Sequence, residues 1–116
     1  MMKMENIEAY KSFIIMQEVT ETGLLGFAIA KNMRKLANEL VEYDGKRNEL
    51  LQKYGTPAEG NRYEFTKENA KRFYDEMAQY DNLEIEFEPM TVFEEVFCGG
   101  NLTSDQMYAL MWMVKE

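Results

Sequence analysis

The residues of this chain whose types could support chemistry are mainly carboxylates. Its 116 residues include 21 Asp and Glu, no histidine and one cysteine, Cys98. Without histidine, Ser-His-Asp and Cys-His nucleophilic sites are excluded, as are most zinc sites. Gly99-Gly100 lacks the Lys and Ser/Thr of a phosphate-binding loop, and the sequence has no calcium loop of alternating Asp and Asn. We therefore expect no catalytic, metal or cofactor site, and a protein that is not an enzyme.

Paired carboxylates are the remaining route to catalysis. Glu94 and Glu95 are adjacent in the sequence, so their side chains would diverge on a helix. Cys98 cannot form an internal disulfide, which fits a reducing compartment such as the bacterial cytoplasm, and it has no cationic neighbour in the sequence that would activate it. An enzyme working through carboxylates alone is thus the weakest alternative.

A row of glutamates is the first candidate binding surface. Residues 83–88 alternate strictly between apolar and acidic side chains, which predicts a half-buried strand. Glu84, Glu86 and Glu88 then share one face at intervals of about 6.6–6.8 Å, close to the spacing of phosphates along a nucleic acid. This face could be an anionic surface for a basic partner, or a solvated face that discourages aggregation. A solvated strand face is by itself enough to explain the alternation.

Trp112 is the second candidate for partner binding. The sequence predicts a last helix that opens with a capping box from Thr103 to Gln106. Trp112 and Met113 lie off the apolar stripe of this helix, so we expect them to form an exposed apolar contact, with packing under the long helix as the alternative. The stripe itself consists of Met107, Leu110, Met111 and Val114.

The elements that must position these residues centre on one long helix from about residue 24 to residue 54. Gly45 lies inside it, where a kink is expected, and Gly55 followed by Pro57 ends it. Its heptad seam could join two chains in a coiled coil, or could be buried under the first and last helices of one chain. Arg47 on the seam favours burial within the chain. The seam consists of Ile29, Met33, Leu36, Leu40, Tyr43, Arg47, Leu50 and Tyr54.

Shorter elements surround the long helix. Asn6 is predicted to cap a first helix that ends at residues 20–23, and Thr66 to cap a helix over 67–80. A strand is predicted over 62–65, and we expect it to pair with the acidic strand into a two-stranded ribbon. The sequence thus predicts a single domain, residues 1–116, of the α+β class and mainly α: a helical hairpin built on the long helix, a small β-ribbon and a C-terminal helix.

The charge balance limits the classes of partner. The net charge is −8, and the basic residues near Lys31 and Lys46 are interleaved with acids, which argues against direct nucleic-acid binding. The most apolar run, residues 24–30, is too short for a bilayer span of about 20 residues. We therefore expect the partner to be another protein with a basic surface, and a homodimer is the alternative.

The order of motifs resembles a family of small phage and prophage proteins of unknown function from Gram-positive bacteria. The resemblance covers about residues 24–116, and the Met-rich C-terminus and the Cys98-Gly99-Gly100 loop depart from it. It implies a phage origin but no functional residues. The matching residues are Lys31-Asn32, Leu36, Glu39-Leu40, Arg47, Glu49-Leu50, Lys53-Tyr54-Gly55, Phe73, Glu76, Leu83 to Phe87 and Leu102-Thr103.

Two functions follow from this origin and from the acidity. The first is a phage-encoded antagonist that binds a host nucleic-acid-handling defence system, in the manner of an anti-CRISPR inhibitor. The second is a virion or tail-assembly accessory protein that oligomerises through the heptad helix. The neighbouring genes would distinguish them, because structural genes on either side would favour assembly.

Overall fold

The computed structural model describes residues 1–115 and shows an α+β fold that is mainly helical, as predicted. Two antiparallel sheets of two strands each accompany the helices of the described chain, β1 with β4 and β2 with β3. The elements in chain order are β1 (Met2–Glu5), α1 (Asn6–Gln17), α2 (Gly23–Glu39), α3 (Val41–Tyr54), β2 (Thr56–Ala58), β3 (Arg62–Glu64), α4 (Lys67–Asp81), β4 (Glu84–Phe87), α5 (Glu94–Cys98), α6 (Ser104–Ala109) and the 3₁₀ helix η1 (Met111–Met113).

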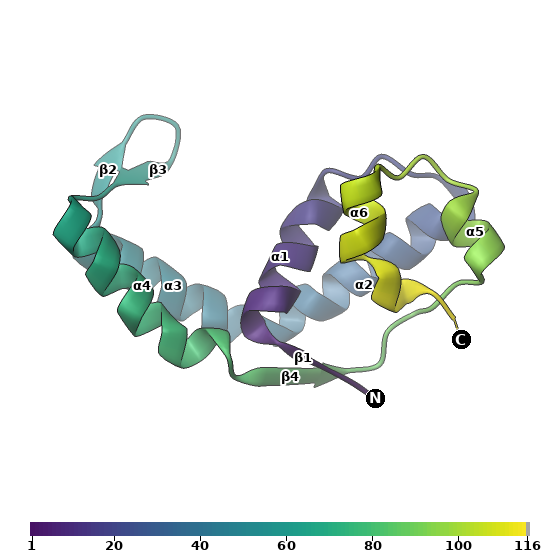
Figure 1. The fold of residues 1–116 in the computed structure, drawn as a ribbon, viewed down its shortest axis with the longest axis horizontal. Coiled ribbons are helices and arrows are strands. Elements are labelled where there is room, and N and C mark those ends of the chain that lie inside the picture. The colour runs from purple at the N-terminus through teal and green to yellow at the C-terminus, as the bar shows by residue number, and fades with distance from the viewer. Residues whose placement is uncertain (116) are drawn as a thin grey trace.

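The molecule consists of a body and an arm, and measures 47 × 30 × 20 Å (Figure 1). The body contains α1, α2, α5 and α6, with β1 and β4 running along one edge. The arm is the hairpin of α3 and α4, and the β2–β3 sheet forms its far end. One cluster of buried side chains continues from the body into the arm, where Phe73 and Met77 belong to it. None of the helices in residues 1–115 is long and apolar enough to cross a bilayer.

The predicted long helix bends at Leu40, and the expected kink near Gly45 is wrong. Leu40 has φ −93° and ψ 4°, which separates α2 from α3. The hydrogen bonds continue across the bend, from Leu40 N–H to Leu36 C=O and from Asp44 N–H to Leu40 C=O. The bend arises because α2 packs on α1 whereas α3 packs on α4. Tertiary packing thus outweighs the weak helix propensity of Gly45.

The heptad seam is buried within one chain. Leu36, Leu40 and Leu50 are all 2% exposed or less. The first helix, α1, covers the seam as predicted, but α4 rather than the last helix covers the rest of it. In this fold the seam leaves no apolar face for a coiled coil with a second copy.

The strands do not pair as predicted. β4 pairs with β1 at the start of the chain, and β3 pairs with β2 through a turn in which Gly60 and Asn61 have φ of 73° and 59°. Glycine and asparagine are the residues that tolerate positive φ best, which explains their place in this three-residue loop. β1 was missed although Met2-Lys3-Met4-Glu5 shows the same apolar–charged alternation as β4.

Two of the three predicted helix caps are confirmed. Thr66 Oγ1 accepts a hydrogen bond from Asn69 N–H, and Thr103 forms a capping box with Gln106. The predicted cap at Asn6 is wrong, because Glu5 occupies the N-cap of α1. Asn6 Nδ2 instead donates to the Tyr80 carbonyl at 2.9 Å, which ties α1 to the end of α4.

Candidate partner-binding surface

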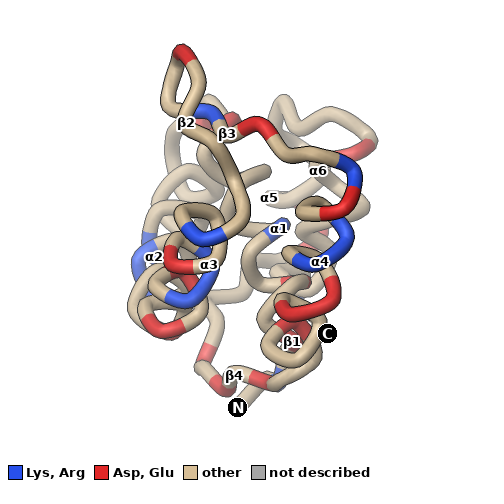
Figure 2. The backbone as a smooth tube through the Cα atoms, turned by 90° about the vertical axis from the view of Figure 1, so that its left-hand side faces the viewer, with Lys and Arg blue, Asp and Glu red and all other residues tan. Residues whose placement is uncertain are grey.

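The predicted acidic face exists, and pairing with β1 enlarges it. Glu84 and Glu86 are exposed on β4 while Ile85 and Phe87, which alternate with them, are buried. The register places Glu5 opposite Glu84 and Lys3 opposite Glu86. We call the outward residues Lys3, Glu5, Glu84, Glu86 and Glu88 the acidic face. Figure 2 shows acidic positions along β4.

The charges of the acidic face are only partly compensated within the described chain, by Lys3 opposite Glu86 and by the Met1 amino group beside Glu88. Glu5 and Glu84 are like charges on directly paired strand positions, an arrangement that destabilises a sheet. No side-chain ion pair reaches Glu84 or Glu86 from the part of the chain that the structure describes. Glu88 lies 3.3 Å from the Met1 amino group.

Two side chains of α2 fix the end of β4 against the body. Asn32 is fully buried, and its amide group binds both backbone groups of Met90: Nδ2 donates to the carbonyl at 2.9 Å, and Oδ1 accepts from the N–H at 2.8 Å. Lys35 Nζ donates to the Glu88 carbonyl at 2.6 Å. These hydrogen bonds anchor the chain at the end of β4 to helix α2. The acidic face is therefore fixed in place, as a preformed binding surface requires.

Trp112 does not lie on the acidic face. Its ring meets Phe87 edge to face, with centroids 5.7 Å apart and an interplanar angle of 82°. Its Nε1 donates to Ser12 Oγ at 3.3 Å, and Ser12 is 5% exposed. Phe87 points to the inner side of β4, so the structure places Trp112 on the opposite side of the strand from Glu84, Glu86 and Glu88.

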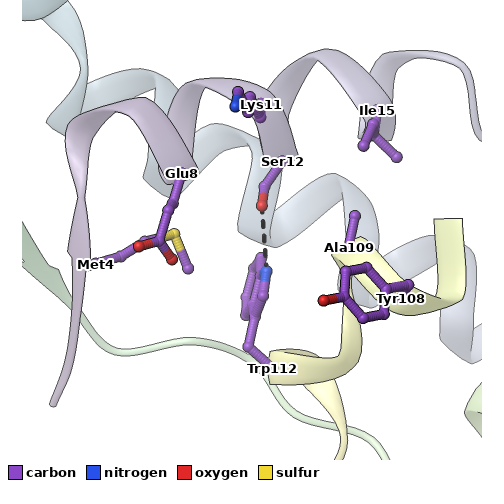
Figure 3. A pocket seen from close by; sticks show the side chains of 8 residues that line it. All are labelled: Met4, Glu8, Lys11, Ser12, Ile15, Tyr108, Ala109 and Trp112. Carbon is purple, nitrogen blue, oxygen red and sulfur yellow. Dashed lines mark hydrogen bonds between the residues drawn. The ribbon is translucent and has the colours of Figure 1, made fainter. Parts of the chain in front are cut away.

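Trp112 instead lines a groove between α1 and α6, shown in Figure 3. The groove has a volume of about 410 Å³, and Tyr108 at its edge is 84% exposed. Glu8 and Lys11 are its charged lining residues. The remaining lining residues are Met4, Ser12, Ile15 and Ala109.

The predicted apolar stripe of the last helix is wrong in its second half. Met113 is fully buried and Met111 is 63% exposed, the reverse of the expectation. The α-helix ends at Ala109, and residues 111–113 form a 3₁₀ turn. Because a 3₁₀ helix has 3.0 residues per turn rather than 3.6, a stripe extrapolated from α-helical spacing loses its register there.

No group of three or more His, Cys, Asp or Glu side chains within residues 1–115 could hold a metal ion. Glu94, Glu95 and Cys98 are all exposed around the short helix α5. Burial of the Tyr43 side chain, helped by its hydrogen bond to Asp81, raises the pKa of Tyr43 well above the usual value for tyrosine.

Comparison of the chain with protein-family models, with curated proteins and with solved structures finds no match. We therefore identify the candidate surface from its geometry and charge alone.

Proposed function

We propose that this protein acts by binding a basic surface of another protein through the acidic face of β1 and β4. The observation that carries the proposal is the directly opposed pair Glu5 and Glu84, two like charges on paired strands that form no ion pair with a cation of residues 1–115. A partner that supplies Lys or Arg side chains there would relieve the repulsion, and complementary charge gives both specificity and fast association.

The most specific form of this function is a phage-encoded antagonist of a host nucleic-acid-handling defence system, comparable to an anti-CRISPR inhibitor and acting in the bacterial cytoplasm without catalysis. Its support is the phage-family resemblance, the net charge of −8 and the phosphate-like spacing of Glu84, Glu86 and Glu88. Such a face would occupy a basic groove that otherwise holds nucleic acid. Virion assembly through the heptad seam receives no support, because that seam is filled by α1 and α4.

A charge-reversal pair of variants tests the surface. The test variant converts Glu84, Glu86 and Glu88 to Lys. The control converts the exposed acids Glu18, Glu59 and Glu64 to Lys, so that the net charge changes equally away from the acidic face. All six positions are exposed, so both variants should fold, which circular dichroism would verify.

The readout is capture from a lysate of the bacterial host, followed by affinity measurement with the captured protein. The proposal expects a nuclease or another nucleic-acid enzyme, bound roughly 10- to 100-fold more weakly by the test variant at low salt. The control variant should bind like the unmodified protein. Equal binding by both variants would refute the acidic face, and capture of only virion proteins would refute the antagonist.

A further inference from the structure

Helix α1 carries apolar side chains on more than one side, and the fold leaves part of this apolar surface uncovered. Ala9, Ser12 and Met16 are buried against the body. On another side Ile7 is half-buried and Ile14 is 42% exposed. The other exposed positions of α1 hold the polar residues Glu8, Lys11 and Gln17. Ile14 and Ile7 therefore form an apolar strip, bordered by polar side chains, that the described chain leaves partly uncovered.

The uncovered side of α1 forms the wall of a notch between the body and the arm. The arm diverges from α1 in Figure 1, and the notch there has a volume of about 460 Å³. Its lining is apolar except at two positions, Lys11 and Arg47. We call this the notch; its residues are Ile7, Tyr10, Lys11, Ile14, Ile15 and Arg47.

The charges of the notch are opposite in sign to those of the molecule. Both charged lining residues are cationic, in a chain whose net charge is −8. The Arg47 guanidinium lies over the rings of Tyr10 and Phe73, 4.9 Å and 5.8 Å from their centroids. Arg47 forms no ion pair with any carboxylate of residues 1–115. Stacking orients a guanidinium while leaving its N–H groups available to an anion.

We propose that the notch is the docking site for an amphipathic helix of a partner protein, with Asp or Glu bordering its apolar face. A shallow apolar notch flanked by two helices suits a third helix, which is a common mode of peptide recognition. Carboxylates on that helix would meet Lys11 and Arg47. The site is separate from the acidic face and binds the opposite charge. The Trp112 groove shares Lys11 and Ile15 with it and continues the apolar surface around α1.

Two synthetic peptides test this proposal on the full-length protein. The first is a helix-forming peptide of about 18 residues, roughly 27 Å long as a helix, with Leu at three- and four-residue steps and Glu on both borders. The second is identical except that Lys replaces every Glu. Titration of the ¹⁵N-labelled protein should show shifts in the α1 amides and around Arg47 with the Glu peptide. The Lys peptide should bind at least about tenfold more weakly.

Single substitutions locate the site. Ile14→Asp should weaken binding of the Glu peptide at least about tenfold, since the substitution places a charge in the apolar contact. Lys11→Glu should weaken binding of the Glu peptide about three- to tenfold and strengthen binding of the Lys peptide. The matched controls are Leu24→Asp, at a residue 54% exposed near the start of α2, and Lys71→Glu on the outside of α4. Both controls should bind the Glu peptide like the unmodified protein.

Three results would overturn the proposal. The first is equal binding of the two peptides, or binding of neither. The second is a shift pattern centred away from α1 and Arg47. The third is concentration-dependent dimerisation in sedimentation that Ile14→Asp abolishes, because a second copy would then be the occupant of the notch.

Discussion

Asn32 offers the sharpest test of how the acidic face is held in place. It is fully buried in the middle of α2, and its amide group satisfies both the N–H and the carbonyl of Met90, just beyond β4. The substitution Asn32→Ala removes the hydrogen-bond partners of both Met90 backbone groups at once. The Met90 backbone groups are then left without hydrogen bonds in a half-buried position, where water replaces them only in part.

The expected loss of stability follows from the free energy that is lost when polar groups are left without hydrogen bonds. Each such group costs about 1–3 kcal/mol, and partial access to water places Met90 toward the lower end, so we expect a loss of about 3 kcal/mol. For a chain of this length the unfolding entropy is about 0.24 kcal/mol/K, so the melting temperature should fall by about 12 °C.

Thermal and urea unfolding followed by circular dichroism measure this loss. Asn38→Ala is the matched control, because Asn38 is exposed on the same helix, and its stability should change by less than about 0.5 kcal/mol. Asn32→Asp adds a second check: its carboxylate would face the Met90 carbonyl, so stability should recover as the pH falls and the group takes up a proton. A loss below about 1 kcal/mol for Asn32→Ala would show that Asn32 does not anchor β4.

Three further predictions concern the arm and the groove. Gly45→Ala should raise the free energy of unfolding by about 0.5–1 kcal/mol, because Gly45 is helical and exposed and an added Cβ meets no atom within 4 Å; a fall in the urea midpoint would contradict this. Because the folded state raises the pKa of Tyr43, it keeps the phenol proton at pH values where the unfolded chain releases it. Stability should therefore fall as the pH rises above about 10, and Tyr43→Phe should reduce that fall in urea titrations at several pH values; an identical pH dependence in both proteins would count against the assignment. Ser12→Ala removes the acceptor of Trp112 Nε1 and should cost about 1 kcal/mol, as measured by the fluorescence of the single tryptophan during urea unfolding; no change would mean that this hydrogen bond contributes nothing.

The features that could be predicted from the sequence are those that short segments determine. The caps at Thr66 and Thr103 depend on residues three positions apart, and the structure confirms both. The burial pattern of β4 follows from strict alternation, so the outward direction of Glu84 and Glu86 was predicted correctly. Each of these depends on hydrogen bonds or side-chain periods within a few residues of chain.

The features that could not be predicted depend on contacts between distant segments. The bend at Leu40 arises where α2 and α3 take different packing partners, and no local signal marks it. Trp112 does not lie where α-helical spacing placed it, because the last helix tightens into a 3₁₀ turn after Ala109. The contribution of Glu5 to the acidic face was missed because β1 pairs with a strand far away in the chain, although the alternation of β1 itself was visible.

That distant pairing fixes when the acidic face can form during folding. Contact between Glu5 and Glu84 closes a loop of about 80 residues, which costs roughly 2.5 kcal/mol more chain entropy than closing a tight hairpin. The helical hairpins, with their local contacts, should therefore assemble first and the β1–β4 sheet last. Until then β4 is an unpaired edge, and its alternating glutamates repel other chains during that interval. The same charges that we propose for partner binding thus also protect the protein while it folds.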